Sequence, residues 1–318
     1  MLSVYGEIAA LLTSVCWSFN SVVFTRAGKR VGSVTVNVMR LWAAFPALLL
    51  LHWLLFGAPL PLDIERQRFF YLGISGFIGF VIGDTMLFES FLLIGPRLAM
   101  LLALLVPVFS TVLAWMWLGE ALRLPEIFSI LVTIAGVAWV VAERTAADDP
   151  AASSVTAAER GGTAFRVSSL QPRKYRLGIW LAVGGAAGQA VGLLFSRLGL
   201  AGGFSAISAT LVRVGTAGLV LAAVSLVQGN LRAHLAKMRD RKALLEITAG
   251  SLTGPVLGVI LSLEAIAHAH IGVASTLMSL TPVLLLPVSH ILFKEKITSR
   301  AIVGTLIALL GVVLLFLA

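Results

Sequence analysis

The stretch GFVIGDTMLFE, from Gly79 to Glu89, has a counterpart 175 residues further along the chain, GPVLGVILSLE, from Gly254 to Glu264. Two glycines and the final glutamate of the first stretch return in the second at this one offset. Further unusual residues are related in the same way: Pro107 meets Pro282 at this offset, and Arg40 meets Arg213 at an offset of 173. Shared Arg, Glu and Pro are far less expected by chance than shared Leu or Val, so the chain is an internal duplication.

The composition indicates that the duplicated unit is a membrane unit. Of 318 residues, 58% are hydrophobic and 12% are charged, whereas soluble domains are roughly 25% charged. Apolar segments of about 20 residues, each long enough to cross a ~30 Å hydrocarbon core as a helix, lie at approximately 6–27, 33–55, 70–93, 97–118, 124–142, 175–199, 204–227, 243–268, 271–293 and 298–317. The sequence therefore predicts an all-α, polytopic membrane protein with ten transmembrane helices.

Residues 143–174 are rich in Ala, Ser, Thr, Gly and acids and lack apolar periodicity, which predicts a disordered polar linker. The linker divides the chain into two five-helix repeats, 1–142 and 175–318. Because five is odd, the second repeat begins on the opposite side of the membrane, and the two repeats are inverted. Inverted repeats are typical of secondary transporters that work by alternating access around a site near the midplane.

Asp84 is the most unusual of the polar residues inside the spans. It lies about ten residues into the membrane from the nearer end of its span, roughly 15 Å deep by helix rise, and its repeat counterpart is the apolar Val259. An acid without a symmetry mate is a candidate for binding a substrate amine or for carrying a coupled proton. The alternative is a neutral acid that is satisfied by a neighbouring hydroxyl such as Thr85.

Other residues at mid-span are candidates for the same site. Trp17, Asn20 and Gln189 fall at a similar level, and buried Asn and Gln side chains need partners across helices or in a wet cavity. We expect them to line a substrate cavity with Asp84, with helix packing as the alternative. Pro107 and Pro282 lie within spans four and nine, where a missing N–H kinks a helix and suits either a hinge or a static bend.

Two further pairs of charges are predicted from depth. Arg40 and Glu89 lie at similar distances from one membrane face, and Arg213 and Glu264 lie at similar distances from the other. An Arg–carboxylate pair would offset the desolvation of both groups. We therefore predict an Arg40–Glu89 pair and an Arg213–Glu264 pair, which act either as static clamps between helices or as gates that open alternately.

Several motifs together resemble a known family. CWSFNSVVFTR (16–26), IGDTMLFES (82–90), VPVFSTVLAWMWLGE (106–120) and TPVLLLPVSHILFKE (281–295), within five plus five spans, resemble the EamA family of the drug/metabolite transporter superfamily. The resemblance covers nearly the whole chain except the linker. It implies a carrier of the bacterial inner membrane, most often an exporter of amino acids or related small metabolites, with a central cavity between the repeats.

An enzyme and a channel are the alternatives. GISG (73–76) is similar to the serine motif of rhomboid proteases, with His268, His270 or His290 as possible bases, but its repeat equivalent lacks serine. Small residues at helix contacts explain GISG better. A channel would favour rings of matched charge. No HExxH, P-loop or GxGxxG-like motif stands in a usable context, so we expect no enzyme activity, no cofactor and no metal.

Most basic residues lie in the loops between spans. They therefore indicate how the protein is oriented in the membrane and do not indicate nucleic-acid binding. Of 24 Lys and Arg, 18 follow odd-numbered spans and four follow even-numbered ones. By the positive-inside rule this places both termini outside the cytoplasm, whereas the family resemblance implies cytoplasmic termini. The expected partners are the lipid bilayer, a small-molecule substrate and, under the coupling hypothesis, protons; the chain is expected to be a monomer or a homodimer.

Overall fold

The computed structural model describes residues 2–119, 122–147, 172–268, 277–293 and 297–317, and all regular structure within these ranges is helical. Nine helices in the described part are long and apolar enough to cross a membrane, and a shorter apolar helix covers Thr281–Phe293. The predicted ninth segment starts at 271, and its first residues, 271–276, lie outside the described ranges. The chain is thus a multi-pass α-helical membrane protein, and the count of ten spans stays a prediction.

The spans of each half follow the predicted order, and several are built from consecutive helices. The first half contains α1 (Leu2–Val31), α2 (Ser33–Phe56), α3 (Arg66–Gly76), the π-helix η1 (Phe77–Gly83), α4 (Asp84–Ile94), α5 (Pro96–Leu102), α6 (Leu105–Leu118) and α7 (Leu124–Ala147). The second half contains α9 (Pro172–Leu200), α10 (Ala206–Val227), α11 (Leu231–Lys237), α12 (Arg241–Ser251), the π-helix η2 (Leu252–Gly258), α13 (Val259–His268), α15 (Thr281–Phe293) and α16 (Ser299–Leu317).

The ends of the predicted linker are helical. α7 continues to Ala147 and α9 begins at Pro172, so the prediction of a linker over 143–174 is too long at both ends. Helices that leave a membrane continue into water at little cost when their residues have ordinary helix propensity, as the Ala-rich end of α7 does. The remainder of the predicted linker, residues 148–171, lies outside the described residues.

The third span of each half contains a π-helix at the same position of the repeat. The π-helix η1 and the π-helix η2 are separated by the same offset of 175 that relates the two sequences. A π-turn inside an α-helix is rare and is found mostly at functional sites, because its wider turn redirects carbonyl groups. The duplicated sequence therefore has a duplicated backbone irregularity.

Glycines inside both π-helices let the two halves touch. A Cβ atom built on Gly188 of α9 would lie 2.9 Å from Cα of Gly83, and one built on Gly192 would lie 3.0 Å from Cα of Gly79. In the other half, a Cβ built on Gly254 of η2 would collide with the Nδ2 atom of Asn20 on α1. Each third span thus makes a close contact with the first span of the opposite half, which only glycine permits.

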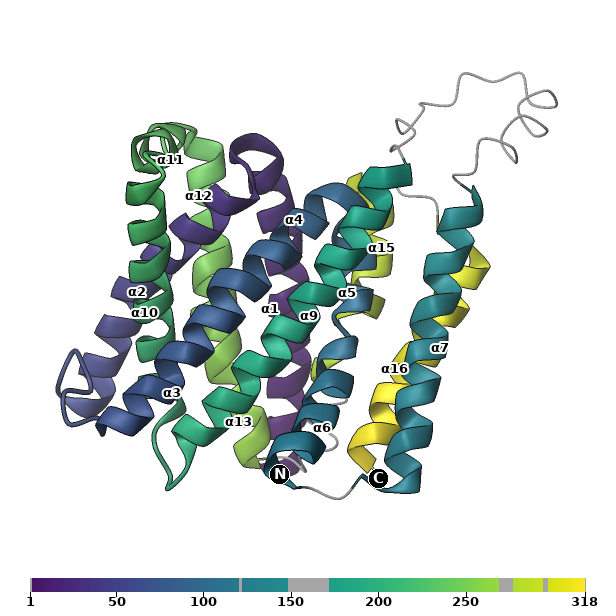
Figure 1. Cartoon of the computed structure of the whole chain (residues 1–318), viewed down its shortest axis with the longest axis horizontal. Coiled ribbons are helices and arrows are strands. Elements are labelled where there is room, and N and C mark those ends of the chain that lie inside the picture. The colour runs from purple at the N-terminus through teal and green to yellow at the C-terminus, as the bar shows by residue number, and fades with distance from the viewer. Residues whose placement is uncertain (1, 120–121, 148–171, 269–276, 294–296, 318) are drawn as a thin grey trace.

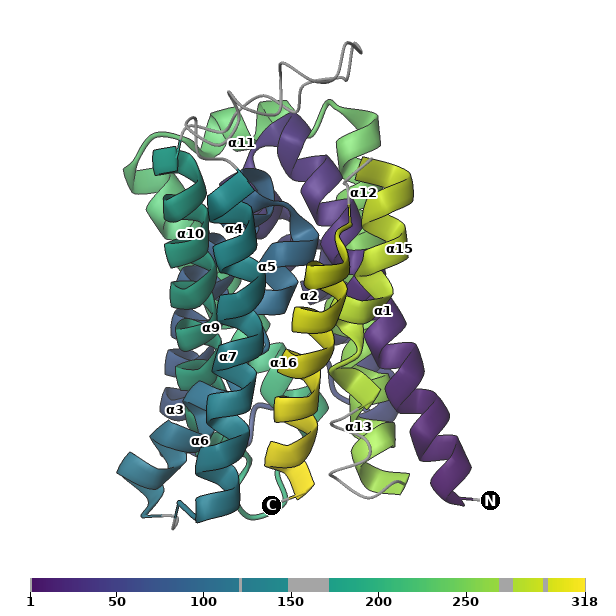
Figure 2. The ribbon, with the colours of Figure 1, turned by 90° about the vertical axis from the view of Figure 1, so that its right-hand side faces the viewer.

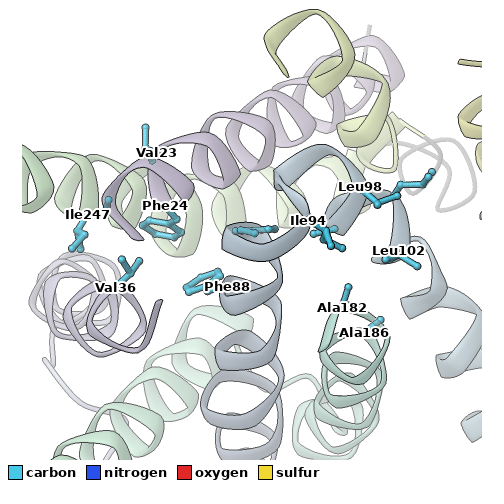
Figure 3. Packing of buried hydrophobic residues seen from close by; sticks show 14 of the residues in the cluster. Val23, Phe24, Val36, Phe88, Ile94, Leu98, Leu102, Ala182, Ala186 and Ile247 are labelled. Atoms are coloured by element: carbon cyan, nitrogen blue, oxygen red, sulfur yellow. The ribbon is translucent and has the colours of Figure 1, made fainter. Parts of the chain in front are cut away.

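The hydrophobic core is continuous across the boundary between the halves. Figure 3 shows Phe24 and Phe88 of the first half beside Ile247 of the second, and Ala182 and Ala186 of α9 facing the helices of the first half. The rings of Phe24 and Phe88 are in tilted contact, with ring centroids 5.2 Å apart.

The last helices of the two halves, α7 and α16, pack along one another at one end of the molecule (Figure 1). Their contact is made by glycines, since a Cβ on Gly136 would collide with the backbone of Ala308 and one on Gly311 would collide with the backbone of Thr133. Both views show the N- and C-termini at the same end of the helices (Figure 2). That arrangement is expected of a chain with an even number of spans.

The outer surface is apolar, as a lipid-facing surface must be. Large hydrophobic side chains are exposed on helices of both halves, among them Trp42, Leu54, Trp117, Leu219 and Ile291. In water, a patch of this extent would be an aggregation hazard. In a bilayer it is the surface that holds the protein in place.

Gly136→Ala should destabilise the protein, because the added methyl group meets the backbone of Ala308 and not a side chain that can move. Overpacking of this kind costs about 1–3 kcal/mol. Gly218→Ala is the matched control, since the nearest atom to its added Cβ would be Leu41 Cβ at 3.9 Å. The measurement is the melting temperature of both variants in detergent; equal melting temperatures would contradict the contact between α7 and α16.

Candidate functional site

A cavity of about 250 Å³ lies between the two halves. The first half contributes residues from its first four spans and the second half contributes residues from its first three. The lining consists of Trp17, Asn20, Ser21, Phe24, Arg40, Leu41, Phe80, Asp84, Leu87, Phe88, Phe91, Met100, Ala103, Val106, Gln189, Thr210, Arg213, Val214, Pro255 and Val259. This volume is slightly below the roughly 300–1,000 Å³ of pockets for drug-sized ligands and suits a small metabolite.

All four residues that the sequence suggested for a midplane site line this one cavity: Trp17 and Asn20 from α1, Asp84 from α4 and Gln189 from α9. The predicted hinge prolines, Pro107 and Pro282, and the predicted ion-pair acids, Glu89 and Glu264, are not part of its lining. Substrate binding by the four residues remains a prediction. The structure shows only that the four side chains line the same cavity.

Asp84 has partners from both halves. Nη2 of Arg40 donates to Oδ2 of Asp84 and forms an ion pair with it, and Nε2 of Gln189 donates to Oδ1. Asp84 and Arg40 are both buried, at 5% and 3% exposure. This pairing of Asp84 with a buried arginine was not predicted from the sequence.

The predicted Arg40–Glu89 pair is wrong, because Arg40 pairs with Asp84 instead. Depth along the helix axis places Arg40 near both acids, but Asp84 and Glu89 are rotated by about 140° from one another at ~100° per residue. Only Asp84 faces Arg40. Glu89 accepts a hydrogen bond of 2.5 Å from the hydroxyl of Ser33, at the start of α2.

Asn37 holds Arg40 in place, and sequence reasoning missed it. Its Oδ1 atom accepts from Nε of Arg40 at 2.9 Å, and its Nδ2 atom donates to the carbonyl of Phe80 and to Oγ1 of Thr85, each at 2.8 Å. Asn37 is fully buried, and a polar residue three positions before Arg40 on the same helix face was the available signal. Because both donors of its amide are engaged elsewhere, the Oδ1 atom of Asn37 stays directed at Nε of Arg40 and holds that side chain.

The π-helix η1 supplies carbonyl groups to this network. Within η1 the N–H of Asp84 bonds to the carbonyl of Gly79, five residues back. The Gly79 carbonyl also accepts from Nε2 of Gln189 at 3.3 Å, and the Phe80 carbonyl accepts from Asn37. Because the wider turn presents these carbonyls to side chains of both halves, the irregular backbone is part of the site.

Arg213 of α10 lines the cavity without an ion pair to Glu264, so that predicted pair is wrong as well. Its guanidinium carbon lies 4.5 Å from the ring centroid of Phe80, and no described residue accepts a hydrogen bond from its buried Nε atom. Glu264 instead has its Oε2 atom 3.3 Å from Nδ1 of His268 on the same helix. Two guanidinium groups and one carboxylate therefore face the cavity.

Helix breaks precede both predicted hinge prolines. α5 ends at Leu102 and α6 begins at Leu105, two residues before Pro107, and α15 begins at Thr281, directly before Pro282. The carbonyl of Ala103, which proline cannot bond, accepts instead from the N–H of Val106 at 3.0 Å. The duplicated prolines thus mark duplicated breaks, and bending at these breaks remains a prediction.

The serine of GISG takes part in packing. Ser75 is fully buried and donates its hydroxyl to the carbonyl of Gly192 at 2.5 Å, at the crossing with α9. It is not among the residues that line the cavity. Ser75 therefore has a packing role at this helix crossing, as expected of small residues in transmembrane helices.

The comparisons with known proteins agree with the duplicated plan. The sequence matches the EamA-like transporter family over residues 4–142 and again over residues 176–317. The chain belongs to the EamA-like transporter family. Members of this family are membrane transporters and not enzymes, so this EamA protein has a small-molecule substrate and a membrane as its surroundings.

The fold of this EamA protein is shared with solved structures. A structure described as "Crystal structure of protein" aligns with a TM-score of 0.57 and 17% sequence identity, over 99% of this chain and 96% of the other. At this identity the likeness concerns the fold alone. Among curated proteins, none matches the sequence.

The Arg40–Asp84 pair gives a double-mutant prediction for this EamA protein. Asp84→Asn alone leaves the buried Arg40 without its counter-charge, and Arg40→Gln alone does the same to Asp84, which costs about 3–5 kcal/mol when a buried pair is broken on one side. The double variant removes both charges, so it should be more stable than either single variant. Melting temperatures in detergent measure this. Additive losses in the double variant would show that the two side chains do not interact.

Proposed function

We propose that this protein is a secondary transporter of the bacterial inner membrane that exports small metabolites such as amino acids by alternating access around the cavity between its halves. Membership of the EamA-like transporter family supports the class of activity. The observation that carries the proposal is the cavity itself, which is lined by both halves and contains the network around Asp84.

The position of the cavity supports alternating access. Transporters built from inverted repeats hold their substrate where the repeats meet and move one repeat against the other around it. In this protein the halves meet at glycines, and at Gly79 and Gly83 the backbone of η1 lies directly against the backbone of α9. The helix breaks before Pro107 and Pro282 offer matched places for bending.

The chemistry of the lining supports a small amphipathic solute. The walls are mostly apolar, with the aromatic rings of Trp17, Phe24, Phe80, Phe88 and Phe91. Polar groups are few, and they lie on α1, α2, α4, α9 and α10. A metabolite with an apolar body and a charged end, as in many amino acids, matches this division.

Asp84 is the proposed site of proton coupling. Protonation of its carboxyl would remove the charge that holds Arg40, and the freed guanidinium would then be available to another anion or to water. Because Asp84 is also bonded to Gln189 of the other half, the same proton would loosen a contact between the halves. Binding of a proton is thereby connected to relative movement of the two halves.

The transport proposal is tested by counterflow in proteoliposomes. Vesicles that contain the purified protein are loaded with a mixture of amino acids and related metabolites, and uptake of labelled solutes against this load is measured. Val106→Trp should abolish counterflow because it fills the cavity. Met116→Trp is the matched control, since it lies on the same helix and is 64% exposed on the outer surface.

A carrier should show counterflow in the wild type and in Met116→Trp but not in Val106→Trp. Passive flux without counterflow would indicate a channel. No flux of any solute in the wild type, or equal flux in Val106→Trp, would remove the cavity from the mechanism.

Proton coupling through Asp84 predicts that a variant can lose its response to a pH gradient and keep counterflow. An imposed pH gradient should accelerate transport by the wild type severalfold, and the double variant Asp84→Asn/Arg40→Gln should lose this acceleration while counterflow continues. The double variant is chosen because it keeps the net charge of the cavity unchanged. The pH-gradient ratio is measured in the same vesicles; a ratio equal to that of the wild type would remove Asp84 from coupling.

A further inference from the structure

We infer that Arg213 binds a carboxylate of the transported solute, so that the substrates are small organic acids with an apolar body. That the bound acid is also transported rests on the proposed function. The binding site for a carboxylate, by contrast, stands on the geometry of the cavity.

Arg213 presents free donors to the cavity. Its buried Nε atom has no hydrogen-bond partner among the described residues, and its guanidinium group makes its closest ring contact with Phe80. This cation–π contact holds the guanidinium group over the Phe80 ring without using its N–H groups as hydrogen-bond donors. The fork of a guanidinium group fits the two oxygens of a carboxylate, which makes a bidentate acid the best-matched ligand.

The carboxylate already present in the cavity does not satisfy Arg213. Asp84 accepts from Arg40 on one oxygen and from Gln189 on the other. Asn37 in turn holds Arg40 toward Asp84, because its Oδ1 atom accepts a hydrogen bond from Nε of Arg40. The nearest acid is thus engaged with other partners, and Arg213 faces it without a hydrogen bond.

The balance of charge leads to the same ligand. Arg40 and Arg213 bring two positive charges to the cavity and Asp84 brings one negative charge. A buried charge without a counter-charge is costly in a membrane interior. A ligand with one negative charge completes the balance, whereas a cationic amine would add to the imbalance.

The remaining lining accepts an apolar body and one further donor. Phe24, Phe88, Phe91 and Val106 provide apolar wall, and Asn20 has a buried Oδ1 atom without a hydrogen-bond partner among the described residues. An amino or hydroxyl group of the ligand can donate to such an acceptor. An α-amino acid is therefore accommodated, but the acid group is the one that is required.

The test compares ligands that share a phenyl body and differ in charge. Phenylacetate, phenylacetamide and phenethylamine are titrated into the purified full-length protein in detergent, and apparent dissociation constants are obtained from ligand-dependent thermal stabilisation. A charged hydrogen-bonded pair at Arg213 should favour phenylacetate over phenylacetamide by about tenfold or more. Phenethylamine should bind most weakly.

The variants assign the preference to one residue. Arg213→Gln should bring the constants for phenylacetate and phenylacetamide to within about twofold of each other, and Arg213→Lys should keep part of the preference as a point charge. Arg232→Gln is the control for loss of a positive charge, since Arg232 is an exposed residue of α11 and does not line the cavity. It should behave as the wild type. Arg213→Lys still tests the inference if Arg213→Gln does not fold.

Equal binding of phenylacetate and phenylacetamide by the wild type, or an acid preference that survives in Arg213→Gln, would overturn the inference. Stabilisation by sodium chloride that equals that by phenylacetate would assign Arg213 to a simple anion instead. Counterflow measured in parallel separates this result from the proposed function. Acid binding without counterflow contradicts the transport proposal alone, and counterflow of solutes that lack an acid group contradicts the carboxylate site alone.

Discussion

The contact of glycine backbones between the two halves is the constraint on which the rest of the structure depends. In the first half Gly79 and Gly83 lie in a π-helix against Gly188 and Gly192 of α9, and in the second half Gly254 receives Asn20 of α1. A Cβ atom on Gly188, Gly192 or Gly254 would lie too close to the facing atoms, so a side chain there would force the helices apart. The distance between the halves, and with it the cavity, is therefore set by residues that have no side chain.

This close approach determines how a buried acid is tolerated. Because α9 touches η1 at the glycines, Gln189 reaches both the Gly79 carbonyl and Asp84. Arg40 reaches the same acid from the first half. The carboxylate is thus stabilised by one residue from each half, and the network closes only when the halves are assembled. A site of this kind reports relative movement, since a shift of α9 by a fraction of a helix turn would remove one of its bonds.

The cavity is asymmetric although the chain is duplicated. Asp84 has Val259 as its counterpart, and Gln189 stands near the repeat position of Trp17. Symmetry supplies the scaffold of helices, π-turns and helix breaks, while the residues that have diverged supply polarity. The two arginines, which are duplicated, now differ in role: Arg40 is bound by Asp84 and Asn37, and Arg213 is left with free donors. Divergence on a symmetric scaffold thus gives the cavity two chemically different sides.

The sequence by itself determined the membrane class, the duplication, the family resemblance and the level of Trp17, Asn20, Asp84 and Gln189, because hydropathy and the axial rise of a helix are local properties. Tertiary structure alone decided which charges meet. The depth of each residue in the membrane predicted the pairs Arg40–Glu89 and Arg213–Glu264. Which side chains meet depends also on the direction in which each points around its helix axis. The π-turns change that direction beside the cavity. The partner of Asp84 and the free donors of Arg213 follow from packing between segments more than 40 residues apart, which no local pattern encodes.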